Sequence, residues 1–219
     1  MDAAQWERTL RQHSRAEGLA ETVRLKAGES VTHDDGVYFP MDAVANLTLC
    51  KEAAHFQVGF AGNGDVIGIH RLLLPDFPPL GATVMRGGQA LRIAQPVLDA
   101  LLESDAVLRQ RMKDYALRST ARFLAEAANA ATLSLEKRVA RWISLCREAV
   151  GSDEIAVTHQ YIATALGVRR SGVTVALHIL EGEHIIRSRR GRIEVLDPEA
   201  LIAYSAADEQ SNPSHPACP

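Results

Sequence analysis

Residues 158–182, THQYIATALGVRRSGVTVALHILEG, hold two apolar segments on either side of Gly167. Thr158 precedes the first segment, and a threonine oxygen there can accept a hydrogen bond from the unpaired N–H groups that begin a helix. Ile162 and Leu166 then recur at helical spacing. Because glycine readily adopts the left-handed conformation that ends many helices, the pattern predicts a short helix that Gly167 closes.

The segment after Gly167 reads as a second helix that begins at Arg169 or Arg170. Its apolar residues share one face at spacings of three and four, and they are Val173, Ala176, Leu177 and Leu180. The opposite face is polar and carries Arg170, Ser171, Thr174 and His178. The small Ala163 allows the two helices to cross closely, so the pair is predicted to be a helix-turn-helix. The second helix of this motif enters the DNA major groove, where its first residues reach base edges.

A basic hairpin is predicted next, within EHIIRSRRGRIEVLD at residues 183–197. Its strands are expected at Ile185–Arg187 and Ile193–Leu196, around a turn that bears Arg189, Arg190, Gly191 and Arg192. This is the pattern of a wing, and guanidinium groups suit it because they bind phosphate bidentately and stay charged. A solvated basic hairpin is the alternative for this segment by itself.

The charge of the chain is unevenly distributed. Residues 137–192 hold ten basic and five acidic residues, a net charge of +5, while the rest of the chain holds 14 basic and 22 acidic residues. A basic module on an acidic body indicates a polyanionic partner for that module.

The first half of the chain has a different texture. Residues 1–20 read as a short polar helix, and from about 22 to 95 short apolar segments alternate with glycine and proline, which predicts an all-β roll or barrel. Turn residues then vanish for about fifty positions after Pro96, so a long helix follows. Beyond residue 206 the chain is polar and rich in proline, and we expect a disordered tail.

Four apolar residues, Leu108, Met112, Tyr115 and Phe123, recur at helical spacing in the long helix. Such a helix at the edge of a small domain can pack on its own copy, so these residues are predicted to form a dimer interface. The alternative is that the helix lies on its own β domain.

Several classes of protein are disfavoured. The sequence has no run of 18 apolar residues, its first residues are polar, and Cys50, Cys146 and Cys218 are scattered. We therefore expect no membrane span, no signal peptide, no disulfide framework, no metal site and a cytoplasmic location. GNGDVIG at residues 62–68 has the wrong spacing for a dinucleotide site and indicates tight turns. No nucleophile elbow, HExxH motif or P-loop is present, so no enzyme activity is predicted.

The segment VTHQYIATALGVRRSGVTVALHILEGEHIIRSRRGRIEVLD, preceded by LEKRVARWISLC, resembles the C-terminal half of Crp/Fnr-family transcription regulators. The first half is similar to the family's sensor domain through AGESV, VYFPMDAVANL, VGFAGNGDVIG and GGQALRI. The resemblance implies an α+β chain with a cyclic-nucleotide-binding-like β-roll at residues 1–96, a dimerisation helix at 97–132 and a winged helix-turn-helix at 133–205. It also implies a homodimer on a two-fold operator, with half-sites roughly 34 Å apart.

The resemblance departs from the cyclic-AMP-binding members. They carry a glycine–glutamate pair and an arginine before a small hydroxyl residue, whereas here Ile69 follows Gly68 and PPLGAT replaces the arginine region. A buried phosphate without a counter-charge is costly, so cyclic AMP is not expected, no cofactor is predicted and the effector is left open. The residues assigned to a candidate effector pocket are Val58, Gly68, Ile69 and Arg86. Haem ligation by His55 or His70 stays open, although a lone histidine is usually structural.

The candidate DNA-binding residues fall in two groups. Those expected to read bases are Arg170, Ser171, Thr174 and Val175, and the valine could meet a thymine methyl. Those expected to bind phosphate are Thr158, His159, Arg169, His178, Arg189, Arg190 and Arg192. The expected partners are double-stranded DNA and a second copy of the chain, with RNA polymerase a further candidate and no membrane. The alternative function is a ligand sensor that acts through protein contacts.

Overall fold

The computed structural model describes residues 20–31, 36–51, 54–70 and 80–206, and the chain divides after Ala127 into two compact units. Three predicted features lie outside the described residues: the polar helix in residues 1–19, most of the proline-rich loop in residues 71–79, and the tail in residues 207–219.

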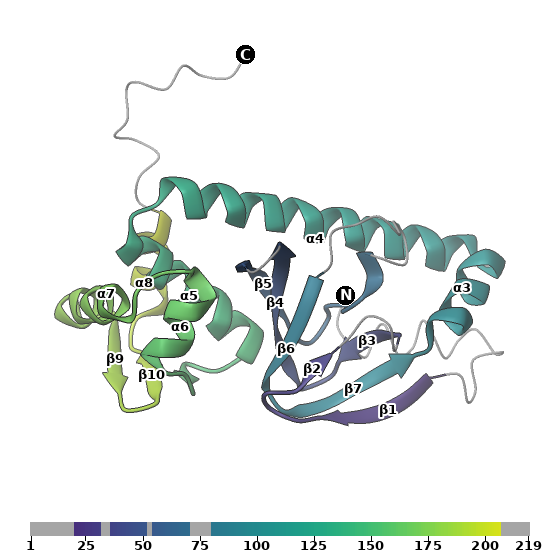
Figure 1. Ribbon diagram of the computed structural model, residues 1–219, viewed down its shortest axis with the longest axis horizontal. Coiled ribbons are helices and arrows are strands. Elements are labelled where there is room, and N and C mark those ends of the chain that lie inside the picture. The colour runs from purple at the N-terminus through teal and green to yellow at the C-terminus, as the bar shows by residue number, and fades with distance from the viewer. Residues whose placement is uncertain (1–19, 32–35, 52–53, 71–79, 207–219) are drawn as a thin grey trace, which may run out of the picture. The chain divides into compact units, whose positions relative to one another are not determined.

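The described strands of the first unit form two sheets (Figure 1). One sheet has the order β1-β7-β3, and its strands are Ala20–Leu25, Gly88–Ile93 and Val37–Pro40. The other has the order β2-β6-β4-β5, and its strands are Ser30–Val31, Leu80–Arg86, Val44–Lys51 and Ala54–Ala61. Every pairing is antiparallel, and alternate side chains of β6, such as Ala82 and Val84, point into the core. The predicted β-roll is confirmed.

Two helices follow these strands, α3 at Gln95–Ser104 and α4 at Ala106–Thr132, and all but the last turn of α4 belongs to the first unit. The sequence predicted one helix through residues 97–132, but the helix breaks at Asp105. The Asp105 side-chain oxygen accepts hydrogen bonds from the backbone N–H groups of Val107, at 2.7 Å, and Leu108, at 2.9 Å. Aspartate thus caps the start of α4, and an N-cap residue takes an extended rather than a helical backbone.

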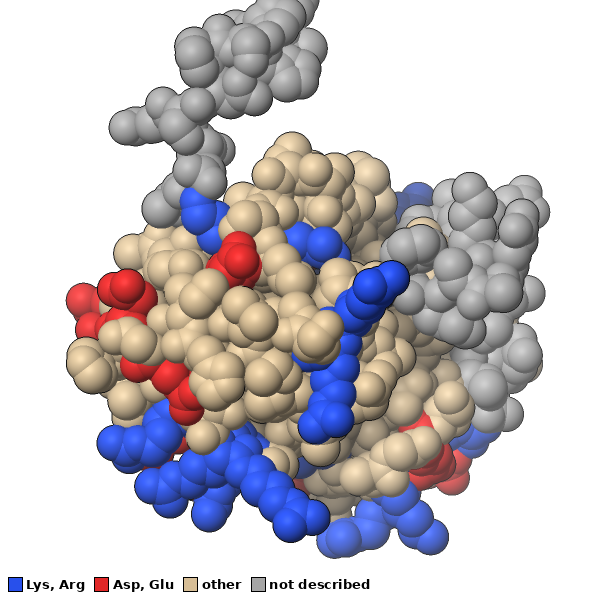
Figure 2. Space-filling model, turned by 60° about the vertical axis from the view of Figure 1, so that its left-hand side comes forward, with Lys and Arg blue, Asp and Glu red and all other residues tan. Residues whose placement is uncertain are grey.

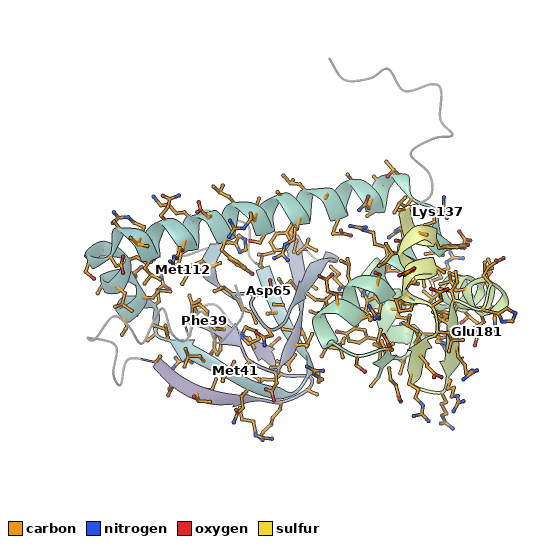
Figure 3. All side chains as sticks on the ribbon, turned by 180° about the vertical axis from the view of Figure 1, so that it is seen from behind. Phe39, Met41, Asp65, Met112, Lys137 and Glu181 are labelled. Atoms are coloured by element: carbon orange, nitrogen blue, oxygen red, sulfur yellow. The ribbon has the colours of Figure 1, made fainter. Side chains whose placement is uncertain are left out.

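The inner face of α4 packs on the strands of the same unit. Figure 3 shows Met112 on the side of α4 that faces Phe39 of β3, and both side chains belong to one buried cluster. Leu108 and Tyr115 lie in the same cluster, and Phe123 packs against a second cluster inside the β-roll. The predicted dimer residues therefore stabilise their own domain, and the prediction of the interface face was wrong. The helical spacing of apolar residues identifies the face of the helix that is buried, but not whether that face packs on its own domain or on a second chain.

A polar contact set also fastens α4 to the turn at residues 62–65. The Tyr115 hydroxyl accepts a hydrogen bond from the Val66 backbone N–H, at 2.8 Å, and donates to Asp65, at 3.1 Å. Arg122 forms an ion pair with the same Asp65 oxygen, at 3.0 Å. The other Asp65 oxygen accepts from the Gly62 backbone N–H. The motif GNGDVIG is therefore a turn anchored on a helix, as expected for a β-roll.

His70 is a second polar anchor beneath α4. Its Nε2 lies 2.7 Å from the Ser119 hydroxyl, and its ring packs on Phe123 with 5.3 Å between centroids. Burial lowers the pKa of His70 to about 4, although a hydrogen bond with the Ala116 backbone opposes the shift. His70 is thus a structural histidine, and the side chain of His55 lies outside the described residues.

The second unit holds the predicted helix pair and hairpin. Its elements are α5 (Leu135–Val150), β8 (Glu154–Ile155), α6 (His159–Leu166), α7 (Arg170–Gly182), β9 (Ile186–Arg189), β10 (Arg192–Val195) and α8 (Pro198–Ala206). The three strands form an antiparallel sheet in the order β8-β10-β9. The helix-turn-helix and wing were predicted within one or two residues of these bounds, whereas β8 and α8 were not predicted.

We predict that His70 makes stability depend on pH. Because the folded pKa lies below the ordinary value of 6.5, the unfolded chain binds the proton more tightly, so stability is complete above pH 6.5 and is lost as pH falls toward 4. Between pH 6.5 and 5 the free energy of unfolding should fall by about 1–2 kcal/mol more than in His70→Gln, measured by urea denaturation. Parallel curves for the two proteins would contradict this role.

Candidate nucleic-acid interface

The turn between α6 and α7 has the geometry that the sequence predicted. The Thr158 hydroxyl accepts a hydrogen bond from the Tyr161 backbone N–H, at 3.1 Å, and so caps the start of α6. Gly167 ends this helix in the left-handed conformation, with φ 65° and ψ 35°. The Val168 N–H then bonds the Ala163 carbonyl, at 2.9 Å, which closes the turn before α7 begins.

The inner face of α7 is fixed by close packing. Its predicted apolar residues are all buried, and they are Val173, Ala176, Leu177 and Leu180. Gly172 lies against α5, since a Cβ atom on it would approach Leu135 Cδ2 to 2.7 Å. A side chain at this position would therefore require the Leu135 side chain to move, a close approach that the sequence pattern did not reveal.

The outer face of α7 is exposed and mixed in character. Arg170 and Ser171 are exposed in the first turn, followed by Val175 with 57% of its surface exposed. Ile179 lies one turn further and is 38% exposed. Three of the predicted base-reading residues, Arg170, Ser171 and Val175, are thus free to meet a ligand from one helix.

Thr174 and His159 are engaged within the protein rather than turned outward. The Thr174 hydroxyl donates to the Arg170 carbonyl, at 3.1 Å, and lies 3.0 Å from His159 Nδ1. The other nitrogen of this imidazole, Nε2, lies 3.2 Å from the Ser188 hydroxyl in β9. Burial lowers the pKa of His159, and the nearby Arg170 and His178 lower it further. The sequence analysis named Thr174 and His159 as candidate DNA contacts, but it did not predict that their side chains form hydrogen bonds within the domain.

The wing carries two paired and two unpaired arginines. Arg187 pairs with Glu194 on the neighbouring strand, at 3.2 Å, and Arg192 pairs with Glu154 of β8, at 2.7 Å. Gly191, with φ 77°, makes the tight turn at the tip. Among the described residues, the exposed Arg189 and Arg190 have no ion pair.

The same holds at the start of α7, where the exposed Arg169 and Arg170 have no ion pair within the described part of the chain. His178 is exposed on the third turn and lies 3.2 Å from Glu181.

Figure 2 shows Lys and Arg side chains gathered along the lower part of the face that comes forward, the end of the domain where the wing lies. Unpaired guanidinium groups at two neighbouring elements make this surface attractive to an anion.

Arg138 is a positioning residue that sequence reasoning missed. It lies on α5, and its Nη2 donates to the Leu166 carbonyl at the end of α6, at 2.7 Å. A cation suits this place because the last carbonyls of a helix are unpaired and carry partial negative charge. Nothing in the spacing of Arg138 distinguishes it from the other basic residues of α5.

The candidate effector pocket is not assembled as predicted. Val58 and Ile69 are buried in two different core clusters, and Gly68, with φ 93°, lies against the Gly36 carbonyl. Arg86 is exposed, and its guanidinium donates to the Asp42 carbonyl, at 2.8 Å. The described residues therefore place these four positions in the core and on the surface rather than around one site.

Residues 137–204 match the family model of a Crp-like helix-turn-helix domain. A putative transcriptional regulator of the Crp/Fnr family from Eubacterium rectale is similar over 88% of this chain and 94% of its own, with a TM-score of 0.72 and 16% identity. A Crp/Fnr-family regulator from Thermus thermophilus is similar over 84% and 98%, with a TM-score of 0.69 and 21% identity. The c-di-GMP-responsive regulator CLP from Xanthomonas campestris is similar over 89% and 99%, with a TM-score of 0.68 and 16% identity. No curated protein sequence matches the chain.

A helix-turn-helix domain with an exposed basic face, joined to a β-roll, defines a DNA-binding transcription regulator. The chain has the Crp-like helix-turn-helix domain and the fold of the Crp/Fnr-family transcriptional regulators. In the described ranges we find no helix long and apolar enough to cross a membrane, and no cluster of three His, Cys, Asp or Glu side chains able to hold a metal ion.

We predict that Gly167→Ala destabilises the second unit. A Cβ atom at φ 65° is strained although open space surrounds it, so the free energy of unfolding should fall by about 1–2 kcal/mol in chemical denaturation. Gly182→Ala is the matched control, because Gly182 lies in α7 without a positive φ and also faces open space. Equal effects of the two substitutions would contradict the requirement for a left-handed residue.

Proposed function

We propose that the chain is a homodimeric regulator that binds a two-fold operator through α7 and the wing. The observation that carries this proposal is the structure of α7, whose apolar face is fully buried while Arg170, Ser171 and Val175 stand exposed on the other face. A helix held in this way presents its side chains in a fixed register, which base readout requires.

The proposed base contacts follow from the chemistry of the exposed side chains. Arg170 would pair with guanine O6 and N7, the commonest specific contact in the major groove. Ser171 can donate to or accept from any base edge, and Val175 would meet the methyl group of thymine. Thr174 enters this proposal through its hydrogen bonds to Arg170 and His159, which steady the first turn of α7.

The proposed phosphate contacts are the unpaired cations on either side of α7. Arg169 at its start and Arg189 and Arg190 at the wing tip are exposed and free for a phosphate. His178 is exposed on the same helix. Arg192 would have to exchange its Glu154 partner, so its contribution to binding should be smaller.

The proposed dimer interface is the outer face of α4, opposite the predicted residues. Leu117 and Leu124 are 70% and 68% exposed and lie seven residues apart, with the exposed Ala121 between them. A stripe at this spacing is typical of two helices that pack along their length. Pairing would bury leucines that water now surrounds.

A dimer of this kind would bind half-sites roughly one helical turn of DNA apart. An effector of the β-roll would act by favouring one relative orientation of the two reading helices. RNA polymerase is a further candidate partner. In the rival function, a sensor acting through protein contacts, affinity for DNA would be low and independent of salt.

We predict different losses from two arginine substitutions. After an operator is selected from random duplexes, Arg170→Ala should weaken operator binding by about 1–3 kcal/mol for each half-site and relax preference at one base pair of each, measured by fluorescence anisotropy. Arg190→Ala should weaken operator and random DNA alike and reduce the slope of log affinity against log salt by about 1 for each protomer of the dimer. Arg147→Ala, which removes a cation paired with Asp153, is the control. An unchanged operator footprint in Arg170→Ala would refute the reading helix.

We predict that Leu117→Glu or Leu124→Glu dissociates the dimer. Burial of each leucine in the interface is expected to stabilise the dimer by about 1.5–3 kcal/mol, and a glutamate removes this contribution and adds a charge. The dimer dissociation constant, measured by sedimentation equilibrium, should therefore rise by at least about tenfold. Arg118→Ala is the control, since it is exposed on α4 about 100° around the helix from Leu117. A dimer unaffected by either leucine substitution would place the interface elsewhere.

A further inference from the structure

Ser188 of β9 is held by two different helices. Its backbone N–H donates to Glu181 Oε1 on α7, at 2.7 Å, and its hydroxyl lies 3.2 Å from His159 Nε2 on α6. Figure 3 shows Glu181 on α7 beside the strands of the wing. The other Glu181 oxygen lies 3.2 Å from His178. The root of the wing is therefore tied to both helices of the helix-turn-helix by side chains.

The contacts of His159 favour one position for the proton of its imidazole. The Thr174 hydroxyl has a single proton, and when it donates that proton to the Arg170 carbonyl it accepts from His159 Nδ1. In this arrangement Nδ1 carries the hydrogen. Nε2 then has a free lone pair and accepts from the Ser188 hydroxyl. Both imidazole nitrogens are thus used inside the domain, and this use competes with the phosphate contact that the sequence predicted.

We propose that His159 is a positioning residue, which fixes the wing relative to the first turn of α7 through both nitrogens of its imidazole. This inference rests on the proposed DNA-binding function. Thr174 joins His159 to the backbone carbonyl of Arg170, and Ser188 lies one residue before Arg189. His159 thereby sets the spacing between the base-reading arginine and the phosphate-binding tip of the wing. The uncharged imidazole also leaves the cations of Arg170 and Arg190 to the DNA.

The proposal distinguishes His159 from a phosphate contact. Loss of a phosphate contact weakens operator and random DNA equally, because phosphates are the same in both. Loss of a positioning residue weakens operator binding much more, because base readout depends on register whereas non-specific binding tolerates a displaced wing. Without these two hydrogen bonds the wing must be ordered on binding, and an ordering cost of about the two bonds corresponds to about tenfold in operator affinity.

The test combines DNA binding with a measurement on the free protein. Operator and random-duplex affinities are measured at pH 8 for wild type, His159→Asn, His159→Ala, Ser188→Ala and the double variant His159→Ala/Ser188→Ala. Thr164→Val is the matched control, because its hydroxyl lies on α6 and bonds only its own helix at Gln160 in the described contacts. Imidazole nitrogen shifts of the free full-length chain, measured by NMR, report the tautomer of His159.

We expect the Nδ1–H tautomer in wild type, a loss of about tenfold in operator affinity for His159→Ala, and little change on random DNA. Ser188→Ala should lose affinity in wild type but not in the His159→Ala background, since the two residues act through one contact. His159→Asn, which can keep the bond to Thr174, should fall between wild type and His159→Ala. Thr164→Val should match wild type.

Two results would overturn the positioning role. One is an equal effect of Ser188→Ala on operator affinity in the wild-type and His159→Ala backgrounds, which would show that the two residues do not act through one contact. The other is an equal loss on operator and random DNA in His159→Ala. If wild type selected no operator at all, the proposed function would fail, and the tautomer together with the effect of Ser188→Ala on the free energy of unfolding in the two backgrounds would still test the His159–Ser188 contact separately.

Discussion

The left-handed turn at Gly167 is the constraint on which the second unit depends. It ends α6 and starts α7 within three residues, and the bond from Val168 to the Ala163 carbonyl fixes the direction of the new helix. The buried stripe of α7 then sets its rotation, because polar and apolar faces cannot be exchanged without exposing the core. The exposure of Arg170 and Val175 follows from these two conditions. The charges of the arginines do not by themselves determine which way these side chains face.

Much of this unit could be predicted because its signals are local. A cap residue, a glycine and a period of 3.6 residues each act within one or two turns, and Thr158, Gly167 and the α7 stripe were all found from them. The inward use of His159 and the role of Arg138 could not be found in this way. Their partners lie 15 to 29 residues away along the chain, and only the fold brings them together.

In the first unit the fold could be predicted from the sequence, but the packing partner of its long helix could not. Its β-roll was recognisable, but the apolar stripe of α4 was assigned to a second copy of the chain when it packs on its own domain. Leu108 and Met112 pack in the core with strand residues, and Tyr115 and His70 add polar bonds to the same contact. A period identifies a face that must be buried, whereas the partner is decided by tertiary packing. The exposed Leu117 and Leu124 lie on the other face of α4, which is the face proposed for association between chains.

The central claim is that two copies of α7, held in register by their domains, read a two-fold DNA sequence. Selection of bound duplexes from a random pool by the full-length chain tests it most directly. We expect enrichment of an inverted repeat whose half-sites lie about 34 Å apart and contain a guanine for Arg170, with affinity that falls steeply as salt rises. Recovery of no common sequence, or of a single unrepeated half-site, would contradict it.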